Sequence, residues 1–92
     1  MYYTYVLLCR NRESNTHEFY TGFTDNLKER LETHKAKGVQ TTKKFDILSL
    51  VYYEACMNKT DARRRELELK TGFGRGYIKK RMKEYLKDIL RS

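Results

Sequence analysis

Five residues of this sequence are candidates for a reacting group that acts on a phosphate ester. Tyr5 and Tyr20 are phenols in strand-like segments, Arg30 and His34 follow in a helical segment, and Glu66 belongs to a later helical segment. A phenol or an imidazole can transfer protons, a guanidinium can stabilise negative charge, and a carboxylate can hold a metal ion. Together these groups suit the chemistry of phosphate esters.

The first helical segment carries two polar groups on the side that should face the core. Leu27, Arg30, Leu31 and His34 follow the i, i+3, i+4, i+7 spacing of one helix face. A guanidinium along an apolar face needs an anionic partner. Alternatively, its stem covers the core while its charged head reaches water. The sequence leaves both interpretations of Arg30 open.

The second helical segment directs a carboxylate inward. Ala62, Arg65, Glu66 and Leu69 share a face, and Ala62 and Leu69 mark that face as the buried one. Glu66 therefore points toward the core or toward the rim of a cleft. It is either half of a structural ion pair with an arginine, or a metal ligand or general base.

The two strand-like segments bring phenols together. Alternation along the first strand places Tyr3, Tyr5 and Leu7 on one face, and Tyr20 and Gly22 share a face of the second strand. If Tyr5 and Tyr20 face the same side, Gly22 beside them permits close approach of a ligand. The alternative is ordinary aromatic packing in a small core.

The segments that carry these residues predict one α+β domain over residues 1–92, with a small three-stranded antiparallel sheet flanked by helices. The predicted order is β-β-α-β-α-α. A polar loop is expected at Arg10–His17 and a glycine-containing break at Thr71–Gly76. The expected strands are Tyr2–Cys9, Phe19–Phe23 and Ile47–Ala55; the expected helices run from a cap at Thr24 or Asp25 to Ala36, from Asp61 to Lys70, and from Gly76 or Tyr77 to Leu90.

The net charge of +8, from 20 Lys and Arg against 12 Asp and Glu, indicates a polyanionic partner, either nucleic acid or an anionic membrane surface. A basic surface that only aids solubility is the alternative. A membrane role is the weakest interpretation, because the last helix lacks a broad Leu, Phe and Trp face. The candidate phosphate contacts are Lys43, Lys44, Lys79, Lys80, Arg81 and Lys83.

Cys9 and Cys56 are the only cysteines, and both adjoin strand-like sequence. We expect them to be reduced and to have no role in the chemistry, since their spacing with the two histidines matches no closed zinc site. The apolar runs are too short to span a bilayer, and the N-terminus lacks the pattern of a signal peptide. A cytoplasmic protein is expected, or a nuclear one in a eukaryote.

These residues and their order resemble the GIY-YIG endonuclease superfamily, especially its small single-domain members. Tyr3-Thr4-Tyr5 matches the first motif and Tyr20-Thr21-Gly22 the second, although Tyr3 and Thr4 replace the Gly and Ile of the first. Arg30 follows Gly22 by eight residues, as the arginine of the family does, and His34 matches a histidine of the small members. Glu66 occupies the place of the family's metal-binding glutamate. The resemblance covers roughly residues 2–82.

The resemblance implies a metal-dependent endonuclease that hydrolyses phosphodiester bonds in DNA, with RNA not excluded. Tyr5 is expected to act as general base, which requires a nearby cation to lower its pKa from about 10. Tyr20 would orient the water or the phosphate, Arg30 would stabilise phosphoryl charge, and His34 would support proton transfer. Glu66 would hold one Mg²⁺ or Mn²⁺ ion.

Two alternatives share this expected fold. One is a non-catalytic nucleic-acid-binding module, and the other is a subunit that cuts only with a partner protein supplying DNA recognition. The sequence contains no separate DNA-binding domain, so cleavage directed by DNA structure or backbone is expected rather than sequence-specific cleavage. Dependence on metal distinguishes a nuclease from a simple binding module.

Overall fold

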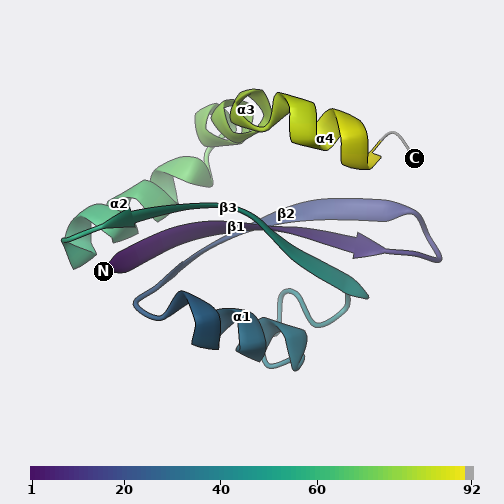
Figure 1. Ribbon diagram of the computed structural model, residues 1–92, viewed down its shortest axis with the longest axis horizontal. Helices are drawn as coiled ribbons and strands as arrows, with labels where there is room; N and C mark the ends of the chain where they lie inside the picture. Colours follow the sequence, from purple (N-terminus) through teal and green to yellow (C-terminus); the bar gives the residue numbers. More distant parts are fainter. Residues whose placement is uncertain (91–92) are drawn as a thin grey trace.

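The computed structural model describes residues 1–90 and shows one antiparallel sheet between two layers of helices (Figure 1). The predicted α+β class is confirmed, with one helix more than expected. The elements are β1 (Tyr2–Asn11), β2 (Thr16–Thr24), α1 (Leu27–Lys35), β3 (Ile47–Cys56), α2 (Lys59–Leu69), α3 (Gly72–Arg81) and α4 (Lys83–Leu90).

The strand order is β2-β1-β3, so β1 lies in the centre and β2 forms an edge. Helix α1 covers one face of the sheet, and α2, α3 and α4 lie on the other (Figure 1). Residues 4–9 of β1 are all buried, because helices cover both faces. The register places Tyr5 opposite Gly22 of β2 and opposite Tyr53 of β3.

Alternate residues of β1 enter separate cores. Tyr5, Leu7 and Cys9 pack with Phe45 on the α1 side, where Leu27 and Leu31 also contact them. The opposite core contains Val6, Leu69, Ile78 and Met82. The predicted division of the first strand into two faces is therefore confirmed.

The hairpin is tighter than the sequence suggested. The expected loop at Arg10–His17 is wrong, because β1 continues to Asn11 and β2 begins at Thr16. The four-residue turn between the strands includes Asn15, whose φ of 55° lies in the left-handed region that Asn tolerates. Polar residues can extend the strands because the hydrogen bonds between strands join backbone groups, while the polar side chains remain in water.

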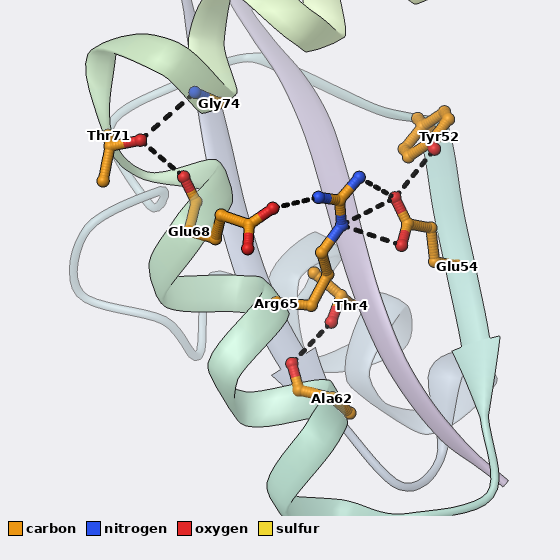
Figure 2. Close-up of polar contacts among 8 residues, drawn as sticks. All are labelled: Thr4, Tyr52, Glu54, Ala62, Arg65, Glu68, Thr71 and Gly74. Atoms are coloured by element: carbon orange, nitrogen blue, oxygen red, sulfur yellow. Dashed lines mark hydrogen bonds and ion pairs between the residues drawn. The ribbon is translucent and has the colours of Figure 1, made fainter.

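The glycine-containing segment also differs from the prediction. Thr71 caps α3 by accepting a hydrogen bond from the Gly74 amide at 3.2 Å, and its hydroxyl donates to the Glu68 carbonyl at 2.7 Å (Figure 2). Helix α3 therefore starts at Gly72, not at Gly76 or Tyr77, and the expected single last helix is interrupted at Met82. Because the cap provides an acceptor for an amide of the first turn, α3 can begin in a segment of glycines, although glycine has a low helix propensity.

Gly74 and Gly76 are expected to respond oppositely to replacement by alanine. A Cβ on Gly74 would lie 2.3 Å from the Leu69 Cα, whereas one on Gly76 would meet nothing within 4 Å. We expect Gly74→Ala to lower the free energy of unfolding by about 1–3 kcal/mol and Gly76→Ala to raise it by about 0.5–1 kcal/mol. Urea unfolding of both variants checks this. Equal effects would show that α3 does not pack this closely on α2.

Polar contacts hold α2 against the sheet (Figure 2). The Arg65 Nε donates to both Glu54 carboxylate oxygens, at 2.9 and 3.1 Å, and the Tyr52 hydroxyl donates to the same carboxylate at 2.8 Å. The Thr4 hydroxyl donates to the Ala62 carbonyl at 2.8 Å. These bonds set the rotation of α2 and explain why the inward-facing Arg65 is stable: its partner is Glu54.

Candidate active site

The candidate site is built around Tyr5, whose ring lies against the backbone of Gly22. Tyr5 and Gly22 are cross-strand partners, and a Cβ on Gly22 would lie 2.4 Å from both Cζ and Oη of Tyr5. No side chain larger than hydrogen fits there. Gly22 thus allows the buried Tyr5 ring to extend under the edge strand β2.

Helix α1 supplies two partners to the Tyr5 oxygen. The Arg30 Nε donates to the Tyr5 Oη at 3.2 Å, and the His34 Nε2 lies 2.8 Å from the same oxygen. Tyr20 of β2 completes the group, with its ring centroid 5.0 Å from that of His34 and 6.2 Å from that of Tyr5. Four of the five predicted site residues therefore form one cluster, and Arg30 has a partner instead of reaching only into water.

Burial, which outweighs the opposing hydrogen bond from Arg30, raises the pKa of Tyr5 to about 12. The sequence-based expectation that a nearby cation lowers this pKa below its usual value is therefore wrong for the protein without substrate. Arg30 acts in the expected direction, but the phenol has lost too much hydration. Tyr5 is a neutral phenol at pH 7 and can accept a proton only while it gives its own proton away.

His34 is the acceptor within reach. Its side chain is fully buried, and its Nδ1 lies 2.8 Å from the hydroxyl of Thr42. Burial and the nearby Arg30 charge lower the pKa of His34 to about 4, so its ring is neutral at pH 7.

Acidification is therefore expected to destabilise the fold through His34. The unfolded chain binds this proton near pH 6.5 but the folded protein only near pH 4, so stability falls as the pH drops between these values. The loss should be on the order of 3 kcal/mol. Urea unfolding at several pH values should show a smaller loss in His34→Gln than in the wild type. His17→Gln, which changes an exposed histidine, is the control and should keep the wild-type dependence.

Glu66 is buried on α2 as predicted, but it is not part of the hydrogen-bonded cluster. Its two carboxylate oxygens pair with Arg63 at 2.8 Å and Lys70 at 2.9 Å; Arg63 belongs to the same helix, and Lys70 is the residue at its C-terminal cap. The structural ion pair that the sequence left open is thus present. The side chains of Arg63 and Lys70 are 59% and 49% exposed, so each can withdraw and free a carboxylate oxygen.

Glu66 fits a metal ion held by a single protein carboxylate, which Mg²⁺ accepts when water and phosphate complete its shell. Among residues 1–90, no group of three or more His, Cys, Asp or Glu side chains is arranged to hold a metal. Cys9 and Cys56 are free, and burial raises the pKa of the Cys9 thiol to about 11. A closed structural metal site is therefore not part of the described chain.

Two cavities lie along β2. The larger, of about 650 Å³, is lined by Tyr20 and Thr21 of β2, by Lys70 just after α2, and by Arg75 and Lys79 of α3. The smaller, of about 340 Å³, is lined by residues that include Arg30, Phe23 and Lys59. Side chains of the Tyr5 cluster and basic side chains of α2 and α3 therefore both border the edge strand β2.

The predicted phosphate contacts are all exposed, and Lys79 lines the larger cavity. Lys70 and Arg75 line it too, although the sequence reading did not single them out. Thr42 was also missed, because a threonine in a basic loop gives no sign that it will be buried. The relevant signal was its spacing from the hydrophobic residues Val39 and Phe45, which anchor the loop.

The model of the GIY-YIG catalytic domain family matches residues 1–81, and the chain belongs to this nuclease family. UPF0213 protein SH2523 of Staphylococcus haemolyticus is 39% identical over 71 residues, which cover 76% of this chain and 80% of that protein. UPF0213 proteins of Lacticaseibacillus paracasei and Lactiplantibacillus plantarum are 44% and 42% identical, over 66% and 75% of this chain and 64% and 66% of their own lengths. No solved structure gives a significant match.

None of the helices described within residues 1–90 has both the length and the apolar character needed to cross a membrane.

Proposed function

We propose that this protein is a metal-dependent endonuclease that hydrolyses phosphodiester bonds in DNA and selects its substrate by structure or backbone rather than by base sequence. The observation that carries the proposal is the Tyr5 phenol, held between Arg30 and His34 beneath Gly22. A buried phenol that contacts both a cation and a neutral imidazole is suited to proton transfer. The membership of the chain in a nuclease family supports the same reaction.

Tyr5 can transfer a proton despite its high pKa, because it need not become a phenolate. The attacking water gives a proton to the Tyr5 oxygen while the Tyr5 proton passes to the Nε2 of His34, which lies 2.8 Å away. The phenol remains neutral throughout, so the buried phenolate is avoided. The negative charge of a bound phosphate favours the imidazolium that results.

Arg30 and Tyr20 complete the reacting group. Arg30 is always charged, lines the smaller cavity and contacts the Tyr5 oxygen, so it can stabilise phosphoryl charge beside the base. Tyr20 lines the larger cavity and orients the phosphate or the water. Glu66 would hold Mg²⁺ or Mn²⁺, and the bound ion supplies a Lewis acid that neutralises the leaving oxygen.

The basic wall of the larger cavity supports nucleic acid as the substrate. Lys70, Arg75 and Lys79 line it beside Tyr20, and further exposed cations extend from it along α3 and α4. Such side chains contact phosphates without reading bases, and binding through them weakens as salt increases. Lys43 and Lys44 of the loop before β3 are proposed to add contacts of the same kind.

One observation favours the second candidate, a binding module that does not cut DNA. An unpaired Glu66 would repel phosphate, but Arg63 and Lys70 neutralise it without any metal. The surface is therefore able to bind a polyanion in the absence of divalent ions.

Cleavage of labelled nucleic acids separates the two candidates. The panel contains duplex, nicked, flapped, branched and single-stranded DNA and one RNA strand, each incubated with Mg²⁺, Mn²⁺ or EDTA. We expect cutting of at least one DNA structure with metal and none with EDTA. Salt-sensitive binding to the panel without cutting under any condition would instead support the binding module or a subunit that requires a partner protein.

A further inference from the structure

Thr42 is buried at the far side of His34 from Tyr5. It lies in the segment between α1 and β3, and 1% of its surface is exposed. The buried side chains of Val39 and Phe45 anchor this segment, and backbone bonds from the Thr42 amide to the Val39 carbonyl and from the Phe45 amide to the Thr42 carbonyl hold Thr42 between them. The hydroxyl of Thr42 is thus held at a fixed place, away from water.

The hydrogen bonds along this row are compatible with either tautomer of a neutral His34, and the proposed proton transfer requires one of them. Arg30 donates to the Tyr5 oxygen, and the proton transfer proposed above needs the Tyr5 hydroxyl to donate its proton to the Nε2 of His34, which must then be the acceptor. A neutral imidazole that accepts at Nε2 carries its proton on Nδ1. In this tautomer the Nδ1 proton faces the Thr42 hydroxyl oxygen, 2.8 Å away, which can accept it.

We propose that Thr42 is a positioning residue for the hydrolysis, because its hydroxyl holds His34 as the Nδ1–H tautomer and aims the Nε2 lone pair at Tyr5. This inference rests on the proposed function. The other tautomer would present an N–H to the Tyr5 oxygen and could not accept the phenolic proton. Partners of this kind fix both the tautomer and the ring orientation of a functional histidine.

The experiment uses Thr42→Val, which replaces the hydroxyl with a methyl group of similar size, and Thr42→Ser, which keeps a hydroxyl. Thr33→Val is the matched control, because the Thr33 hydroxyl donates only to a backbone carbonyl of its own helix, that of Glu29 at 3.0 Å. Long-range ¹H–¹⁵N NMR spectra of the full chain at pH 7 identify which ring nitrogen of His34 carries the proton. Steady-state cleavage is measured in parallel on the same proteins to obtain kcat and KM.

We expect the wild type, Thr42→Ser and Thr33→Val to show the proton on Nδ1, and Thr42→Val to show mixed tautomers. We also expect Thr42→Val to lower kcat by about ten- to a hundred-fold with little change in KM, and Thr42→Ser to restore most of the rate. A wild-type spectrum with the proton on Nε2 overturns the inference even if Thr42→Val does not fold. An unchanged spectrum or an unchanged kcat in a folded Thr42→Val also overturns it. If the wild type cuts no substrate, the proposed function fails, and the spectra still report on the tautomer.

Discussion

Glu66→Gln is expected to lower the cleavage rate by at least about a thousand-fold, since a catalytic metal stabilises the transition state by several kcal/mol and each 1.4 kcal/mol is about tenfold in rate. The amide keeps the size of the side chain but removes the charge that would hold the ion. Arg63 and Lys70 lose their partner, but both are exposed enough to be hydrated, so the fold should persist.

Glu68→Gln is the matched control for this experiment. Glu68 lies on the same helix, is exposed, and pairs with Arg65, which Glu54 also holds. We expect the Glu68→Gln protein to cut DNA at the wild-type rate. Calorimetric titration with Mn²⁺ in the presence of a non-cleavable substrate should show binding to the wild type and to Glu68→Gln but not to Glu66→Gln. Cleavage by Glu66→Gln within tenfold of the wild type would remove Glu66 from the proposed site.

Gly22→Ala is expected to lower cleavage by about 10²- to 10⁴-fold, the range that a positioned proton-transfer group contributes. The added methyl group would overlap the end of the Tyr5 ring, because its carbon would lie 2.4 Å from the Tyr5 oxygen. The ring must then leave the position in which it bonds to Arg30 and His34. The rate should fall to about that of Tyr5→Phe, which keeps the ring and loses only the hydroxyl.

Gly76→Ala controls for the addition of a methyl group, since that site is open, and it should cut normally. If Gly22→Ala does not fold, Tyr5→Phe still tests the role of the phenol, because its fit beneath Gly22 is unchanged. Wild-type cleavage by a folded Gly22→Ala, together with wild-type cleavage by Tyr5→Phe, would show that Tyr5 takes no part in the reaction.

Periodicity in the sequence was enough to predict which helix faces are buried. Leucine spacing placed Arg30 and His34 on the inner side of α1, and Ala62 and Leu69 placed Glu66 on the inner side of α2. These predictions succeed because helix geometry depends on local spacing. The same reasoning did not locate the start of α3, because a single side chain, the Thr71 cap, outweighs the low helix propensity of the glycines that follow it.

The sequence by itself determined the α+β class, the two-faced central strand, the candidate catalytic residue types and the strong positive charge. Only the tertiary structure decided how those residues act. Burial raises the pKa of Tyr5 above its usual value, a loop residue far from any motif contacts His34, and Glu66 is paired with one cation of α2 and one at its C-terminal cap. Solvation and long-range contacts set these properties, and both depend on which chain segments the fold places around a group, a quantity that no local pattern in the sequence contains.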